Sequence, residues 1–220
     1  YTVIDASLGS STAFRKISVN GQSDGLPPGV DPYDVKMMTA FRGALVIVTC
    51  SGEAWVIATS SYSKFRGNGN TGDENTWYQV EQATGGFLTD VIVVRTGWDN
   101  MMALKNDGTI WTWGNSTYLG DGSNINTSRT KAYQMVAPPG TIKMIGTTQG
   151  AYFCSMTDKY LYTLGDNHDN VMGISYLTAA SSKVWTQPRY SASATDVLDN
   201  IVWISPQENG GGEAAINVLT

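Results

Sequence analysis

Residues 91–116 read VIVVRTGWDNMMALKNDGTIWTWGNS, and this stretch decides the fold. It contains three short apolar runs, separated by a polar break and by the turn Asn106-Asp107-Gly108. The runs lie at 91–94, 101–104 and 110–113. Short apolar runs bounded by Gly, Asn and Asp are typical of β-strands, and an Asp-Gly pair between two of them indicates a hairpin. The stretch therefore predicts three consecutive strands.

The same pattern recurs on both sides of this stretch. Residues 35–60, VKMMTAFRGALVIVTCSGEAWVIATS, align with it without a gap and place Gly52 at the position of Gly108. Residues 142–167, IKMIGTTQGAYFCSMTDKYLYTLGDN, align with it again. A repeat of roughly 50 residues, in which each unit is a few short strands, indicates a β-propeller.

A fourth strand follows the three in each unit, and each of these segments carries an aromatic residue at the matched place. The segments are 13–18, 76–81, 131–136 and 183–190. Pro188 suits an outer edge strand, where a missing N–H group is harmless. No segment of any length shows the periodicity of a helix. The fold class is therefore predicted as all-β, a propeller of four-stranded antiparallel blades.

The two ends of the chain are predicted to share one blade. Residues 201–220 match the first two strands of a unit, and residues 1–7, YTVIDAS, match the third. Thr220 and Tyr1 would then be the two sides of one interrupted hairpin, and residues 1–18 would complete the blade. Such pairing removes exposed sheet edges. We expect a single domain, 1–220, of about four blades; the alternative is a run of consecutive blades from a larger ring. The predicted units begin near residues 35, 91, 142 and 201.

The composition limits the possible partners. The chain has 220 residues and a formal net charge of −5, with 14 Lys and Arg. This balance argues against a nucleic-acid partner, because basic groups are needed to neutralise phosphates. No apolar run approaches the roughly 20 residues that span a bilayer, so no membrane insertion is expected. Abundant Gly, Ser, Thr and Asn with sparse charge favour an extracellular or cell-surface protein, and the absence of an initiator Met suggests a piece of a larger parent assembly.

A family resemblance rests on residues 102–122. The segment 102–114, MALKNDGTIWTWG, followed by Leu119-Gly120 and Gly122, resembles the regulator of chromosome condensation repeat. The resemblance implies a propeller of four-stranded blades. It does not imply nucleotide exchange, because no matched exchange residues are present. The sequence departs from the repeat at Asn100, where the family often has His, and at Lys159, which replaces the turn glycine.

Aromatic residues recur at matched places in the third strands. Trp111 aligns with Trp55 in the unit before and with Tyr162 in the unit after, and Trp113 aligns with Ile57 and Leu164. We interpret this set as core between stacked blades. A carbohydrate-stacking platform is the alternative.

The connections between third and fourth strands are the predicted binding loops. In three units these connections are about ten residues longer than in the unit whose third strand is predicted at residues 1–7. Lengthened loops on a rigid scaffold commonly carry binding surfaces. The aromatic residues of these loops could equally fill gaps at the rim of the propeller. They are Tyr62, Phe65, Tyr118 and Tyr176. The candidate binding residues are Tyr62, Phe65, Asn68, Asp73, Tyr118, Asp121, Asn124, Asp166, His168 and Asp169.

The residues that could carry chemistry form no recognisable set. His168 is the only histidine, within Asp-Asn-His-Asp-Asn at 166–170. Alternating carboxylates and amides suit Ca²⁺, but the glycine and the distal Glu of an EF-hand are missing, so a solvated turn is favoured. Cys50 and Cys154 fall in non-neighbouring units and are expected to be free, partly buried thiols. No catalytic residues, metal or cofactor are therefore predicted.

These features favour a non-enzymatic recognition or spacer domain of a secreted or cell-surface protein, such as an adhesin or a phage fibre. Its ligand would be a protein or a glycan. Two alternatives remain open, a propeller-type glycosidase or lyase and a cytosolic regulatory propeller. The enzyme would need carboxylates that converge on the innermost strands.

Overall fold

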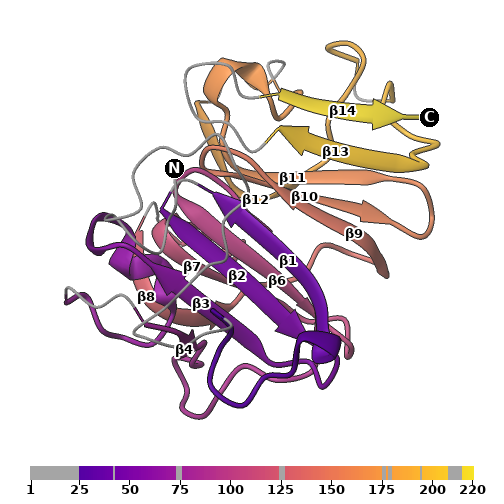
Figure 1. Cartoon of the computed structure of the whole chain (residues 1–220). Helices are drawn as coiled ribbons and strands as arrows, with labels where there is room; N and C mark the ends of the chain where they lie inside the picture. Colours follow the sequence, from indigo (N-terminus) through magenta and orange to yellow (C-terminus); the bar gives the residue numbers. More distant parts are fainter. Residues whose placement is uncertain are drawn as a thin grey trace, which may run out of the picture.

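A computed structural model gives the structure of the chain. It describes residues 25–41, 43–72, 76–123, 127–174, 177, 180–193, 195–207 and 215–220. Within these residues the strands form three four-stranded sheets and one two-stranded sheet, and every pairing between neighbouring strands is antiparallel. Figure 1 shows the sheets fanned beside one another in the order of the chain, from indigo to yellow.

Each four-stranded sheet is a run of four consecutive strands. The first is β1 (Val35–Phe41), β2 (Ala44–Thr49), β3 (Ala54–Ala58) and β4 (Tyr78–Gln79); the second is β5 (Val91–Thr96), β6 (Asn100–Lys105), β7 (Ile110–Thr117) and β8 (Thr127–Gln134); the third is β9 (Ile142–Thr147), β10 (Ala151–Met156), β11 (Leu161–Asp166) and β12 (Ser181–Thr186). The two-stranded sheet pairs β13 (Trp203–Gln207) with β14 (Ala215–Leu219). Three short 3₁₀ helices, η2 (Pro32–Asp34), η3 (Ser60–Arg66) and η4 (His168–Asn170), lie in the connections of the described part.

The first strands of successive sheets are the innermost ones. β1 contacts β5, β5 contacts β9, and β9 contacts β13, so these strands converge on one side of the fan. β8 lies at the other end of the second sheet, with β6 and β7 between it and β5. The predicted blades of four strands, with 91–94 innermost and 131–136 in the outermost strand, are thereby confirmed.

The predicted starts of the repeats agree closely with the observed strands. β1, β5 and β9 begin at residues 35, 91 and 142, and β13 begins two residues after 201. The first two strands predicted for the last blade are observed as β13 and β14, but that the two ends of the chain share this blade stays a prediction. Residues 1–18, and hence the pairing of Tyr1 with Thr220, lie outside the described residues.

One outer strand differs from its prediction. The strand expected at 183–190 is β12, which ends at Thr186, so Pro188 is not on an edge strand. The chain turns away there, because the carbonyl of Pro188 accepts a hydrogen bond from Leu198 N–H (2.9 Å). Arg189 forms an isolated bridge with Val197.

The hairpin turns between second and third strands share one backbone geometry. In the second sheet, Lys105 N–H donates to Thr109 O (2.9 Å) and Gly108 N–H donates to Lys105 O (3.0 Å). The same two bonds recur in the first and third sheets. Gly52, Gly108 and Lys159 accordingly have positive φ angles of 84°, 83° and 71°. Lys159 thus adopts the left-handed conformation that suits glycine.

The core lies between the sheets. Trp111 and Trp113 are 6% and 0% exposed and pack with residues of β2 and β3, such as Val46 and Val56. A second cluster joins the second and third sheets, and a third joins the third sheet to β13 and β14. The prediction that the matched tryptophans form core between blades is confirmed.

A buried tyrosine makes a polar contact across the second of these interfaces. The hydroxyl of the fully buried Tyr152 lies 2.7 Å from Thr112 Oγ1, which itself donates to Met101 O (2.9 Å). The Tyr152 hydroxyl also lies 3.4 Å from Ser116 O, so it has polar partners in β7 although it is buried. Burial raises the pKa of Tyr152, because the phenolate would lose its hydration.

Candidate binding surface

The loop between β3 and β4 is anchored to the second sheet by Phe65. The ring of Phe65 is fully buried, and Tyr62 stacks on it with ring centroids 5.7 Å apart and planes 9° apart. The indole N–H of Trp113, in β7, donates to Phe65 O (2.7 Å). A Cβ atom on Gly114 would lie 2.8 Å from the Phe65 ring, so only glycine leaves room for this contact. Phe65 therefore fills the rim and belongs to the core, the alternative role that the sequence left open.

A buried arginine that the sequence did not single out holds the same loop together. Arg66 is 0% exposed, and its Nε and Nη2 donate to Ala58 O at 3.2 and 2.9 Å. Its Nη1 donates to Gly72 O, further along the loop. A buried guanidinium needs several acceptors to offset its lost hydration. The carbonyls at both ends of the loop provide them.

The loop that follows β7 is anchored to the third sheet in an analogous way. Tyr118 is 5% exposed, and its hydroxyl donates to Asp166 Oδ1 at the end of β11 (2.6 Å). Burial, and then the hydrogen bond to Asp166, raise the pKa of Tyr118. The structure thus brings two predicted site residues together. Their contact spans the boundary between two sheets, so it stabilises the loop.

The polar candidates lie in turns on these anchored loops. Asn68 Oδ1 accepts from Asn70 N–H (3.1 Å), and Asp121 Oδ1 accepts from the backbone N–H and the hydroxyl of Ser123. The bonds from Ser123 lower the pKa of the exposed Asp121 carboxyl. Asp169 is also exposed and has a positive φ angle of 53°. Turn chemistry accounts for Asn68 and Asp121.

The remaining predicted residues cannot be placed. Asp73, Asn124 and Tyr176 lie outside the described residues, as does the side chain of His168. Among the residues that the structure does describe, no three His, Cys, Asp or Glu side chains come together as a metal site. Within that same part, no helix has the length and apolar character needed to cross a membrane.

The two cysteines are free, but their surroundings differ. Cys154 is fully buried, and burial raises the pKa of its thiol. Cys50 is exposed, which corrects the prediction that both thiols are partly buried. The hairpin turn after β2 begins at Cys50, so its side chain leaves the interface between sheets.

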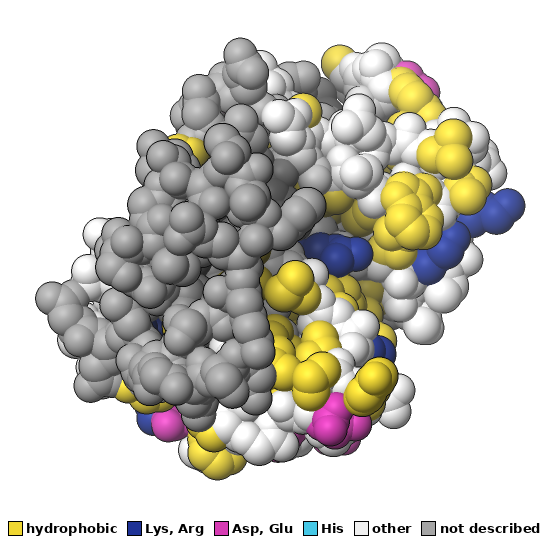
Figure 2. All heavy atoms as spheres, viewed as in Figure 1, with side chains coloured by type: hydrophobic (Ala, Val, Ile, Leu, Met, Phe, Trp, Pro, Cys, Tyr) yellow, Lys and Arg dark blue, Asp and Glu magenta, His cyan; other side chains and the backbone are white. Residues whose placement is uncertain are grey.

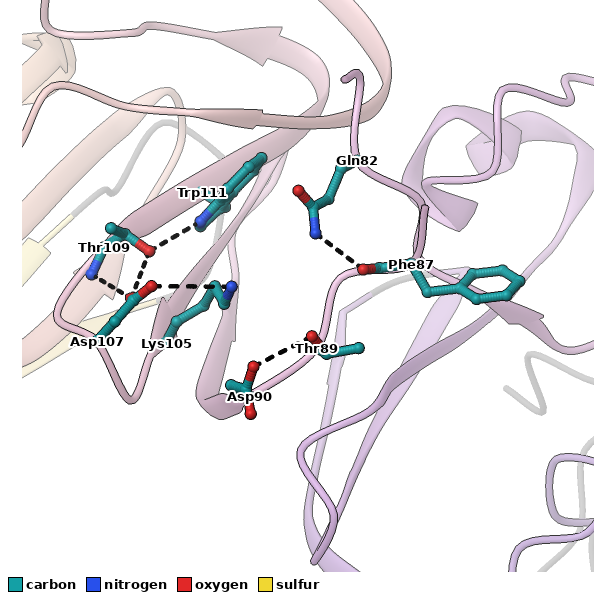
Figure 3. Close-up of polar contacts among 8 residues, drawn as sticks. All are labelled: Gln82, Phe87, Thr89, Asp90, Lys105, Asp107, Thr109 and Trp111. Atoms are coloured by element: carbon teal, nitrogen blue, oxygen red, sulfur yellow. Dashed lines mark hydrogen bonds and ion pairs between the residues drawn. The ribbon is translucent and has the colours of Figure 1, made fainter. Parts of the chain in front are cut away.

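Side chains stabilise the hairpin turn of the second sheet (Figure 3). Asp107 Oδ1 accepts from Thr109 N–H (2.9 Å) and from the Thr109 hydroxyl (2.6 Å), and Thr109 Oγ1 accepts from the indole N–H of Trp111 (3.1 Å). Lys105 Nζ lies 3.9 Å from Asp107 Oδ2 and 5.9 Å from the centroid of the Trp111 ring. These bonds satisfy the one polar atom of Trp111, so its polar contacts are internal to the hairpin.

The innermost strands share a feature that sequence reasoning missed. In β1, Val35 and Met37 pair with the adjacent residues Thr49 and Val48, so Lys36 is an extra residue. The same register shift makes Ile92 extra in β5 and Lys143 extra in β9. Each four-stranded sheet therefore has a β-bulge at the second residue of its first strand. Matched positions in the repeats could have signalled that these residues are equivalent, but not that they bulge.

Comparisons with known proteins identify the architecture. No protein-family model matches the sequence, and no curated protein matches it. Among solved structures, human WBSCR16 is similar with a TM-score of 0.57 at 16% identity, over 78% of this chain and 43% of that chain. Yeast RCC1 (Prp20), solved with Kap60 bound, gives 0.56 at 18% identity, over 78% and 37%.

A further structure of Prp20p from Saccharomyces cerevisiae, described with its binding properties to Gsp1p and histones, gives a TM-score of 0.56 at 14% identity, over 81% of this chain and 42% of that chain. The present chain spans less than half of the length of each of these proteins. At these identities the likeness establishes the fold, an RCC1-like β-propeller. The resemblance found in the sequence and the predicted fold class are both confirmed.

Proposed function

We propose that this chain is a non-enzymatic recognition domain, which binds a protein through the loops between the third and fourth strands of its blades. One observation carries the proposal. Two of these loops are fixed to the next sheet, one by Phe65 beneath Trp113 and the other by the Tyr118–Asp166 hydrogen bond. A loop held in one conformation loses little entropy when it binds, which favours affinity.

The solved structures of the same fold support a protein as the ligand. Yeast RCC1 was solved with Kap60 bound, and Prp20p was described with Gsp1p and histones. A glycan is the second ligand class that the sequence left open, but the aromatic rings that suggested it are engaged in the core. Trp113 is fully buried and Trp111 is 6% exposed, and the half-buried Trp55 and Tyr162 pack against core clusters.

The location of the protein is also part of the proposal. We place it outside the cell or on its surface, because charged residues make up only 15% of the chain and Gly is abundant. Protease treatment of intact source cells tests this location. Loss of the protein without cell lysis supports it, whereas full protection together with an intracellular marker would favour the cytosolic regulatory propeller.

Site-specific photo-crosslinking in the source cells tests recognition. A photoreactive amino acid at Asp121, on the anchored loop, is expected to give discrete adducts with a protein. The same amino acid at Tyr33, which is 95% exposed in η2 and lies outside these loops, is the matched control. Equal adducts at both positions, or adducts that a glycosidase removes, would contradict a protein-binding loop surface.

A further inference from the structure

The inner bulges form a rim with a defined order of side chains. We define the inner rim as the three bulge residues, Lys36, Ile92 and Lys143, together with Val202, which aligns with them next to β13. Extra residues in bulges are re-aimed relative to the strand, and bulges recur beside functional sites. From β1 to β13, cationic and apolar residues therefore alternate along the inner rim.

Three of the four rim residues are exposed, and one of the cations is held in place. The fourth, Ile92, is half-buried and packs against the core cluster of the second and third sheets. Lys36 and Lys143 are exposed, and Val202 is 48% exposed. Lys143 Nζ donates to Val202 O (2.9 Å), so its ammonium group spans from the bulge of β9 to the next inner strand. An ammonium group has three donors, so Lys143 retains two for a ligand.

The charge of this region is opposite to that of the whole chain. The four inner strands contain Lys36, Arg95 and Lys143 but no Asp or Glu, although the chain carries a net charge of −5. Among the described residues, the ion pairs are Lys105–Asp107 and Lys131–Glu81, so none engages these three cations. The carboxylates nearest in sequence are Asp34 and Asp90, which precede β1 and β5, and Asp99, which follows β5.

Exposed apolar side chains adjoin the rim. Met38, in β1, is 63% exposed, and Trp203, the first residue of β13, is 56% exposed. Figure 2 shows Lys and Arg side chains next to hydrophobic ones on the face of the described part. A surface that combines cations with apolar groups is complementary to a segment with carboxylates and apolar side chains. It fits a phosphate polymer less well, since half of the rim would face phosphate without a donor.

We propose that the inner rim binds an acidic polypeptide segment of a partner protein. Lys36 and Lys143 contact its carboxylates, and Ile92, Val202 and the neighbouring Trp203 contact its apolar side chains. This site is separate from the anchored loops, but it rests on the proposed function, since it presumes that the domain recognises proteins. The partner's carboxylates provide the charge that the innermost strands lack.

Fluorescence anisotropy with the whole chain and a labelled peptide, EELEELEE, tests the proposal. The neutral peptide QQLQQLQQ is the matched comparison. The acidic peptide is expected to bind and the neutral one to bind at least about tenfold more weakly. The Lys36→Gln/Lys143→Gln variant should lose about tenfold in affinity for the acidic peptide, and the Lys36→Arg/Lys143→Arg variant should retain it, because the charge remains.

A control variant separates the rim from the overall charge. Lys131→Gln/Lys183→Gln removes the same charge from the outer strands β8 and β12 and should leave the affinity unchanged. Equal losses in the two glutamine variants, or equal binding of a single-stranded oligothymidylate, would overturn the proposal. The acidic peptide could fail to bind while photo-crosslinking at Asp121 still yields a protein adduct. That result would refute an acidic ligand at the inner rim and leave the proposed function standing.

Discussion

The hydroxyl of Tyr118 lies 2.6 Å from Oδ1 of Asp166, and this hydrogen bond joins a loop of the second sheet to the end of β11 in the third. Tyr118, which is the donor, is buried, with 5% of its surface exposed. The corresponding link between the first and second sheets runs from Trp113 to the carbonyl of Phe65. At each interface between these sheets, a hydrogen bond from a buried aromatic residue thus links a loop to the neighbouring sheet.

Tyr118→Phe should lower the free energy of unfolding by about 1.5–3 kcal/mol, the range for a hydrogen bond to a charged group. The substitution keeps the buried ring and removes only the donor to Asp166. Denaturant unfolding measures the change. Tyr33→Phe is the control, because Tyr33 is 95% exposed and should give no loss. Equal stability of both variants would show that the Tyr118–Asp166 bond contributes nothing.

Stability should fall as the pH rises above about 10, the usual pKa of tyrosine. Tyr118, Tyr152 and Tyr162 all have raised pKa values in the folded chain, with burial as the largest cause. Their contribution is therefore complete below pH 10 and is lost at higher pH, where the unfolded chain releases protons that the folded chain retains. Each such tyrosine adds a slope of about 1.4 kcal/mol per pH unit.

Tyr118→Phe should make the fall of the free energy of unfolding with pH less steep by ~1.4 kcal/mol per pH unit, which is the contribution of one tyrosine. Denaturant unfolding of the variant and the parent at several pH values between neutral and strongly alkaline measures it. An unchanged slope would mean that Tyr118 ionises as readily in the folded chain as in the unfolded one.

Trp111→Ala should destabilise the chain by about 3–5 kcal/mol, as a large-to-small substitution in a core does. Trp111 is 6% exposed between the first and second sheets. Denaturant melts give the loss. Trp203→Ala is the matched comparison, since Trp203 is 56% exposed and should cost much less. A loss below about 1 kcal/mol for Trp111→Ala would show that its ring is not part of the core, and would favour the alternative of a carbohydrate-stacking platform.

Lys159→Gly should stabilise the chain by about 0.5–1 kcal/mol, because glycine adopts a positive φ angle without steric cost. Lys159 has φ 71° at the turn position that Gly52 and Gly108 occupy in the other sheets. Lys159→Ala removes the same charge but keeps the strain, so its stability should match the parent. Thermal and denaturant melts of the three proteins measure the effect, and a gain shared by both variants would attribute it to charge.

The sequence prediction that the two ends of the chain share a blade has its own measurement. A circular permutant, with Thr220 joined to Tyr1 by four residues and new ends in the turn at Gly85-Gly86, should fold with the stability of the parent. The reason is that the repeat alignment leaves only a hairpin turn between those ends. A permutant that fails to fold, while a permutant with a long flexible linker folds, would show that the ends lie too far apart.

Local patterns explain which parts of the fold could be predicted. The starts of β1, β5 and β9 follow from alternation of apolar runs and turn residues, which is a property of the chain itself. The end of β12 was missed because it depends on the bond between Pro188 and Leu198, two loop residues ten positions apart. Strand propensity alone gives no signal for it.

The site was harder to predict than the fold. Phe65 and Tyr118 were found as loop aromatics, but only tertiary packing shows that they anchor the loops to the next sheet. Arg66 resembles any surface arginine in the sequence, although it is fully buried. The bulges at Lys36 and Lys143 depend on the register between two strands, which periodicity does not specify.

Backbone hydrogen bonds between successive sheets bear on how such a chain can change in length. The N–H of Val91 donates to Gly52 O, and the N–H of Ile201 donates to Lys159 O, both at 2.9 Å. Val91 begins β5 and Ile201 lies two residues before β13, so each bond joins the start of one unit to the hairpin turn of the sheet before. Contacts of this kind involve neighbouring units alone. Duplication or loss of one complete unit in the gene would therefore create no new kind of junction, and blade number is a property that evolution can alter in whole steps.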